Sequence, residues 1–271
     1  MGRLDAAHAE ARQQRKLAGA NSADFSEALA RGLAVLSAFG AERRRLTQAD
    51  LARELGLPRA TVRRAVVTLE HLGYLEADGR SYELSPRILR LSEGYLRSNV
   101  ISTIVQPACD RICDELTASC SVAVLDGPDA VMIARAVPQR LLPVGSGIGF
   151  RVPARRSALG KVLLAHLDSS DEDPTGHDSA TAADEAVDAA VDTAVDDEVL
   201  REIRDVGHCY VVNDVEAGFH SIAVPIKRWD GRVIAALNAG SALERLSAEE
   251  MSGRVLETLR RNADELQGQL L

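Results

Sequence analysis

Residues 47–79 constrain the fold more than any other part of the chain. Thr47-Gln48-Ala49-Asp50 has the spacing of a capping box, which predicts a short helix that ends at Gly56. Pro58 suits the first turn of a second helix, because its fixed φ angle is already helical. Two short β-like runs then flank Asp78-Gly79, a dipeptide typical of hairpin turns. The segment therefore predicts a winged helix-turn-helix.

The second helix of this segment is predicted to have a buried face and a cationic face. Its apolar residues fall within an arc of about 100° when plotted at helical spacing. Three arginines lie on or beside the opposite face, and an Arg guanidinium can bond bidentately to base edges in a DNA major groove. A single exposed arginine usually does no more than solvate a helix, but three within six residues favour DNA binding. The predicted DNA contacts are Thr47, Gln48, Arg59, Ala60, Thr61, Arg63, Arg64 and Arg80, with Arg44 and Arg45 as further candidates for the DNA backbone.

Charge is distributed unevenly along the chain. The formal net charge is −8. Residues 1–97 hold 16 Lys and Arg against 12 Asp and Glu, whereas residues 98–271 hold 16 against 28. A basic N-terminal part joined to an acidic remainder is expected when only one domain meets phosphate. The asymmetry predicts that DNA contacts are confined to the N-terminal domain.

Apolar periodicity predicts further helices on both sides of the winged segment. A helix is expected to start near Asp24, with Glu27 completing a capping box. Its buried face is predicted to consist of Leu29, Leu33 and Leu36. Residues 86–98 are predicted to form a linker helix, and residues 100–116 an amphipathic helix.

The second half of the chain mixes helices with hairpins. Hairpins are expected around residues 126–129 and across Trp229-Asp230-Gly231, and helices over 158–166 and from Ser247 towards the C-terminus. The fold class is therefore α+β. We divide the chain into a flexible N-terminal arm (1–22), a winged helix-turn-helix domain (23–85), a linker helix (86–98) and an α/β C-terminal domain (99–271).

An acidic insertion near 168–198 interrupts the C-terminal domain. It carries twelve acidic residues and no Lys or Arg. Residues 168–183 are predicted to be a loop, and the later part a helix, because its valines recur at helical spacing. The composition of the insertion does not indicate catalysis.

Several stretches of the sequence carry a family resemblance. They are residues 29–33 with 46–73 (LTQADLARELGLPRATVRRAVVTLEHLG), 82–91, 153–165 (PARRSALGKVLLA) and 218–239 (GFHSIAVPIKRWDGRVIAALNA). On these stretches the chain resembles the IclR family of bacterial transcription regulators. Within that family it is most similar to the branch that controls protocatechuate and 4-hydroxybenzoate catabolism, because Ala134-Arg135 is followed by residues 140–149 and 151–154.

The resemblance implies a dimer, or a dimer of dimers, whose C-terminal GAF-like domain binds a small organic acid, aromatic in this branch. Family effector contacts carried over to this sequence are Ser157, Ala158, Leu159, Ser221, Asn238 and Gly240. Asp214, after Asn213, stands where the family has acidic residues. The helix start at Ala158 suits a carboxylate, and Arg135, Arg155 or Arg156 is a candidate to neutralise it. Alternatively, Ser157 only caps a helix and Asn238 only satisfies a hairpin edge.

The sequence lacks the signature motifs of several other classes of protein. It contains no G-x-S-x-G elbow, P-loop, strand-linked G-x-G-x-x-G or H-E-x-x-H, so no enzyme, catalytic residue or cofactor is predicted. Its four cysteines match no common zinc module, so no metal is predicted, and buried thiols are expected. No apolar run is long enough to span a membrane, and the N-terminus has no signal-peptide core. We therefore expect a cytoplasmic protein.

Two alternatives to a ligand-controlled regulator remain open at this level. In the first, residues 100–271 are an enzyme and the N-terminal domain only targets it to DNA. In the second, the protein binds DNA constitutively and the C-terminal domain only dimerises. Turnover of an aromatic acid would support the first alternative, and the absence of stabilisation by any carboxylic acid would support the second.

Overall fold

The computed structural model describes residues 25–40, 43–138, 147–167, 196–214 and 216–270. The chain divides into two compact units, residues 1–95 and 96–271. We call them the head and the sensor domain. Their boundary falls inside the predicted linker helix. The predicted arm and most of the acidic insertion lie outside the described residues.

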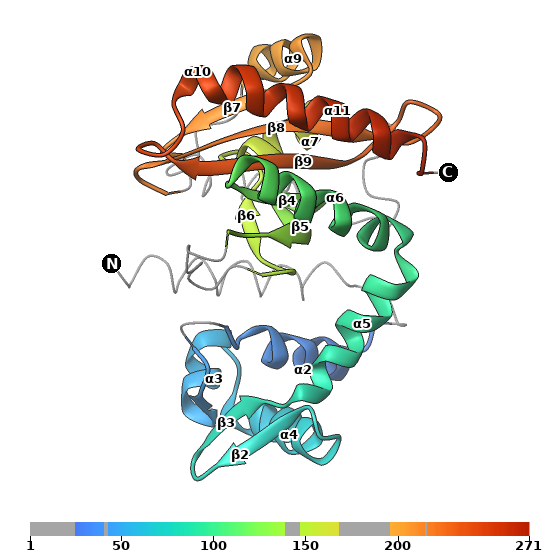
Figure 1. Cartoon of the computed structure of the whole chain (residues 1–271). Helices are drawn as coiled ribbons and strands as arrows, with labels where there is room; N and C mark the ends of the chain where they lie inside the picture. The colour runs from blue at the N-terminus through green and yellow to red at the C-terminus, as the bar shows by residue number, and fades with distance from the viewer. Residues whose placement is uncertain (1–24, 41–42, 139–146, 168–195, 215, 271) are drawn as a thin grey trace. The chain divides into compact units, whose positions relative to one another are not determined.

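The head has the elements of a winged helix-turn-helix (Figure 1). They are α2 (Glu27–Ser37), β1 (Leu46–Thr47), α3 (Gln48–Leu55), α4 (Arg59–His71), β2 (Leu75–Asp78) and β3 (Ser81–Leu84). The predicted capping box holds the start of α3, and Gly56 ends that helix in the left-handed conformation (φ 61°). Strands β2 and β3 form the predicted hairpin, and the short β1 pairs with β3 in a sheet of order β1-β3-β2.

Two expectations for α2 were wrong. Its N-cap is Ser26, whose hydroxyl accepts the Leu29 N–H, and the helix begins at Glu27 rather than near Asp24. Two of the three predicted core leucines, Leu29 and Leu33, are 63% and 52% exposed, whereas Leu36 packs against the head core as predicted. The face that packs into the head core is instead formed by Ala34, Val35 and Ala38. This face packs against α4, which leaves the two leucines on the outer side of α2.

The linker begins differently from the expected single helix. Pro86–Ile88 forms a 3₁₀ turn (η1) capped by Ser85, and α5 runs over Leu89–Ser98. No residue of α5 is buried. Asn99 then caps the next helix, α6 (Val100–Leu116), as the periodicity predicts.

The sensor domain is built around one antiparallel sheet of order β6-β5-β4-β9-β8-β7. Its strands are β4 (Ser119–Asp126), β5 (Asp129–Ala136), β6 (Arg151–Pro153), β7 (Cys209–Val212), β8 (Phe219–Lys227) and β9 (Val233–Ala242). Its further helical segments are α7 (Ala158–Ala165), α9 (Asp197–Val206), α10 (Ala248–Glu250), η2 (Met251–Val255) and α11 (Leu256–Gln267). Both predicted hairpins are present, and the predicted α+β class is confirmed.

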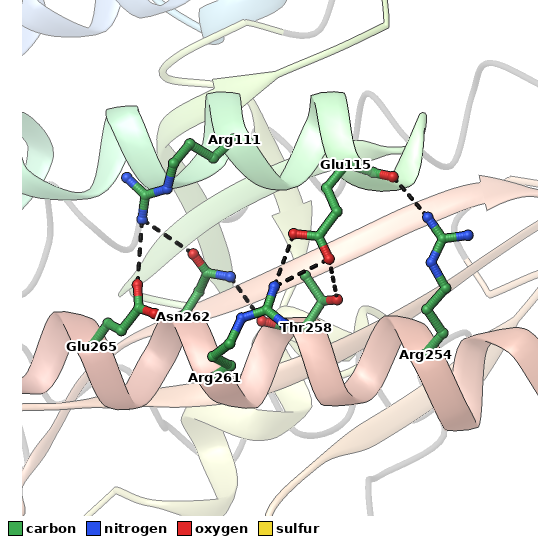
Figure 2. Close-up of polar contacts among 7 residues, drawn as sticks. All are labelled: Arg111, Glu115, Arg254, Thr258, Arg261, Asn262 and Glu265. Atoms are coloured by element: carbon green, nitrogen blue, oxygen red, sulfur yellow. Dashed lines mark hydrogen bonds and ion pairs between the residues drawn. The ribbon is translucent and has the colours of Figure 1, made fainter.

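Helices cover both faces of this sheet (Figure 1). On one face α6 and α11 enclose a core that includes Ile112, Leu237 and Leu259. On the other face α7 and α9 enclose a smaller core of mostly alanine and valine side chains. Polar contacts also join α6 to α11, with Glu115 and Arg111 directed at the neighbouring helix (Figure 2). The predicted effector residues lie on the α7 face.

Candidate DNA interface and effector site

The exposed face of α4 is cationic. Val62, Val66 and Leu69 are buried in the head core, as predicted. The predicted contacts Arg59, Ala60, Arg63 and Arg64 are exposed, and Thr61 is half-buried. Within the described part of the chain, the three guanidinium groups form no ion pair or hydrogen bond. These cations are therefore available to an external anion.

The two predicted contacts at the start of α3 already have partners inside the head. The Thr47 hydroxyl accepts the Asp50 N–H and donates to the Asp50 carboxylate at 2.7 Å. Hydrogen bonds from Thr47 hold the pKa of Asp50 below its usual value. The Gln48 side-chain amide donates to the Tyr82 hydroxyl at 3.1 Å. Both side chains position α3 against the sheet.

Of the three candidate arginines for the DNA backbone, the one on the wing, Arg80, is free of partners in the described residues. Arg80 is exposed beside Gly79, whose φ of 63° allows the tight hairpin turn. Arg45 pairs instead with Asp78 at 2.6 Å and with Glu83 at 3.1 Å. Arg45 therefore ties the loop before α3 to the wing, whereas Arg44 is exposed.

Strand register brings several predicted effector residues onto one face of the sensor sheet. Arg135 on β5 lies opposite Ser121 on β4, and Ser121 lies opposite Asn238 on β9. Two such inter-strand steps place Arg135 and Asn238 about 10 Å apart across the sheet. The next row on the same face holds Gly240 opposite Ser221. The sheet thus brings together residues that are more than 100 positions apart in sequence.

Arg135 and Asn238 each carry a buried polar atom without a partner in the described residues. For Arg135 it is Nε, and for Asn238 it is the amide oxygen Oδ1. The Arg135 guanidinium approaches Met132 Sδ, and no described carboxylate pairs with it. Burial lowers the pKa of Arg135, which nevertheless stays charged at neutral pH. A half-buried cation with a buried, unpaired Nε is costly, so this site favours an anion.

The N-terminus of α7 is the second predicted element of the site. Ser157 is buried and caps α7 by accepting the Gly160 N–H at 3.1 Å. Ala158 and Leu159 are buried, and their N–H groups belong to the first turn, which has no intrahelical acceptors. A Cβ on Gly160 would lie 2.2 Å from Ala154 Cα, so this glycine permits the close approach of α7 to residues 153–156.

Asp214 has a partner on α7. Its carboxylate pairs with Lys161 at 2.7 Å, and Arg156 donates to its backbone carbonyl. Asn213 has a φ of 60°, and its side chain accepts the Gly218 N–H. Asp214 therefore fixes the β7–β8 connection against α7, and its charge is already neutralised. Arg155 is exposed.

Two residues of this face were missed at the sequence level. Ser121 is buried between Arg135 and Asn238. The Phe219 ring lies over Gly240, where an added Cβ would be 2.7 Å from two ring carbons. An aromatic side chain thus stands beside the polar row. Phe219 lies inside the GFHS stretch, but only strand register reveals which face it occupies.

Metal and membrane features were also sought in the described residues. All four cysteines are free and buried, as expected, and no group of His, Cys, Asp or Glu in the described ranges could hold a metal ion. No helix found there is both long and apolar enough to cross a bilayer.

Two family models match the chain in the order of its two units. Residues 28–79 match the IclR helix-turn-helix domain, and residues 93–267 match the C-terminal domain of the bacterial transcriptional regulator IclR. The chain belongs to the IclR family. Members of this family are transcription regulators rather than enzymes, and this IclR-family protein is an effector-controlled DNA-binding regulator.

Similar proteins include regulators of aromatic catabolism. The Pca regulon regulatory protein of Pseudomonas putida is 38% identical over 87% of this chain and 81% of its own length. The p-hydroxybenzoate hydroxylase transcriptional activator of Acinetobacter baylyi is 34% identical over 90% of this chain and 91% of its own length. An IclR homolog from Microbacterium hydrocarbonoxydans, whose structure was solved with 4-hydroxybenzoate, has a TM-score of 0.67 and 26% identity. The match covers 90% of this chain and 99% of that one. The expected branch resemblance is confirmed.

Proposed function

We propose that this IclR-family regulator binds a double-stranded DNA operator in the cytoplasm and is controlled by a hydroxylated aromatic carboxylic acid. Arg59, Ala60, Thr61, Arg63 and Arg64 would enter the major groove, and Arg80 would contact the backbone beside it. Thr47 and Gln48 would add contacts at the start of α3. The unpaired guanidinium groups on the exposed face of α4 support this assignment.

The observation that carries the effector proposal is the pair of unsatisfied groups on the α7 face. The Arg135 cation calls for an anion, and the buried Asn238 Oδ1 calls for a hydrogen-bond donor. A carboxylic acid that bears a hydroxyl at the end opposite its carboxylate provides both the anion and the donor. Phe219 supplies an aromatic surface beside them, and the first-turn N–H groups of α7 suit the carboxylate. Ser157, Ala158, Leu159, Ser221 and Gly240 would line the same site, with Asp214 holding its edge.

The regulator is proposed to act as a homodimer or a dimer of dimers. Leu29 and Leu33 lie one turn apart on the outer face of α2 and expose more than half of their surface. Apolar side chains repeated on one helix face favour burial against a second copy. A dimer would present two copies of α4 to successive half-sites of a palindromic operator.

DNA binding is tested by titrating the purified protein against the intergenic DNA beside its gene and against random DNA. Arg63→Ala should weaken operator binding by about 1–3 kcal/mol and random-DNA binding by less, since a base contact carries sequence information. Arg53→Ala is the matched control, because Arg53 is exposed but pairs with Asp50 on α3. Equal losses on both DNAs would reduce Arg63 to a phosphate contact, and salt-insensitive binding would refute the model.

Effector binding is tested by thermal shift with a panel of hydroxybenzoates and short carboxylic acids. Stabilisation by 4-hydroxybenzoate, weaker stabilisation by benzoate and none by 4-hydroxybenzamide are expected, because the amide lacks the charge that Arg135 requires. If no acid of the panel stabilises the protein, a hydroxylated aromatic carboxylic acid is not its effector.

A further inference from the structure

The backbone of Arg135 is held by a side chain of α6. The Arg135 N–H donates to Gln106 Oε1 at 3.1 Å, and the Arg135 carbonyl accepts from Gln106 Nε2 at 3.0 Å. Strand β6 pairs with β5 only at Asp129–Val131, so it does not reach this position. The Gln106 amide therefore takes the place of a neighbouring strand at the sheet edge, satisfying both backbone groups of Arg135.

Helix α6 is divided at this point. Pro107 follows Gln106 and lies inside the helix, where it cannot donate to the carbonyl one turn earlier. Removing that hydrogen bond makes the helix easiest to bend between its first half, residues 100–106, and its second half.

The second half of α6 is fixed to α11 (Figure 2). Glu115 accepts hydrogen bonds from Thr258 at 2.9 Å and from Arg261 at 2.8 Å, and Arg111 donates to Asn262 at 3.2 Å. In the described residues, the polar side-chain contacts between the first half of α6 and the sheet are those of Gln106. The first half also follows α5 directly in the chain, and α5 crosses the boundary between the two units.

We propose that Gln106 is the positioning residue that couples the effector site to the DNA-binding head. This inference rests on the proposed role of Arg135 in effector binding. An anion that draws the Arg135 side chain moves the β5 backbone at the sheet edge, and the paired amide of Gln106 carries that movement into residues 100–106. Bending at Pro107 then passes it to α5, while the second half of α6 stays on α11.

Coupling is measured as the ratio of operator affinities with and without saturating 4-hydroxybenzoate. In the wild-type protein this ratio, or its inverse, is expected to be about 5 to 150. Gln106→Met retains the length of the side chain but removes the amide that bonds to the Arg135 backbone, together with its bond to Asp110 Oδ1 at 2.9 Å. It should bring the ratio to within about twofold of one, while the Kd for 4-hydroxybenzoate in the absence of DNA changes less than about threefold. Gln267→Met is the matched control, because Gln267 is also half-buried and also donates to a backbone carbonyl, that of Arg228.

The outcomes separate this inference from the proposed function. If wild-type protein neither binds 4-hydroxybenzoate nor responds to it, the proposed effector fails. If the wild type responds and Gln106→Met responds equally, the coupling role is wrong. It is also wrong if Gln106→Met loses effector affinity more than about tenfold, which would make Gln106 part of the binding site. Gln106→Glu keeps the acceptor for the Arg135 N–H but loses the donor to the Arg135 carbonyl and to Asp110, and it too should lower the coupling ratio.

Discussion

Replacing Arg135 by Met should change effector affinity and stability in opposite directions. Arg135 carries a partly desolvated cation with no described carboxylate partner, and its guanidinium lies against the thioether of Met132. A hydrogen bond to a charged group contributes about 1.5–3 kcal/mol. Because 1.4 kcal/mol is about tenfold in Kd, the variant should bind 4-hydroxybenzoate about 10- to 100-fold more weakly.

Without ligand the same variant should be more stable than the wild type. Removing a half-buried, unpaired charge should raise the free energy of unfolding by at most about 1 kcal/mol, which is a Tm increase of up to about 2–4 °C for a domain of this size. At a ligand concentration of about 100 times the wild-type Kd, the wild type gains about 2.7 kcal/mol and a variant weakened 100-fold about 0.4 kcal/mol. The order of the two melting temperatures should therefore invert as ligand is added.

Calorimetric titration with 4-hydroxybenzoate and thermal unfolding with and without it measure both effects. Arg155→Met is the control, since Arg155 is exposed and should change neither quantity appreciably. A variant of Arg135 that is less stable than the wild type yet binds the acid normally would refute the reasoning. Such a result would assign Arg135 to structural support alone.

Three further predictions follow from packing, burial and exposure. Gly160→Ala should lower the Tm by about 3–10 °C, because the new Cβ would collide with the Ala154 backbone. Gly253→Ala is the control, since the space around Gly253 is open and its Tm should not fall. A stabilised Gly160→Ala variant would contradict the close approach of α7. Burial raises the pKa of Cys209 to about 11. Alkylation of Cys209 at pH 8, followed by mass spectrometry, should therefore be at least about 100-fold slower in the folded protein than in urea. Equal rates would contradict the burial of this thiol. Leu33→Ser should weaken self-association by at least about tenfold in sedimentation experiments, with the helical content kept in circular dichroism, and an unchanged dimer would remove α2 from the interface.

Local signals in the sequence determined the architecture of the head. The capping box, the left-handed Gly56 and the Asp78-Gly79 turn act over a few residues, so their geometry does not depend on the rest of the fold. The outward face of α4 was likewise predictable, because its apolar residues occupy a single arc. The same approach failed for α2, which has an apolar stripe on each side, and only packing against α4 decided which one is buried.

Tertiary structure alone decided the composition of the effector face. Arg135, Ser121 and Asn238 become neighbours through strand register, and a shift of one residue would turn each side chain to the opposite core. No sequence signal marks Gln106 as the partner of a strand edge 29 residues away. Both features depend on contacts between distant segments, whose pairing is fixed by the packing of the whole domain rather than by local propensity.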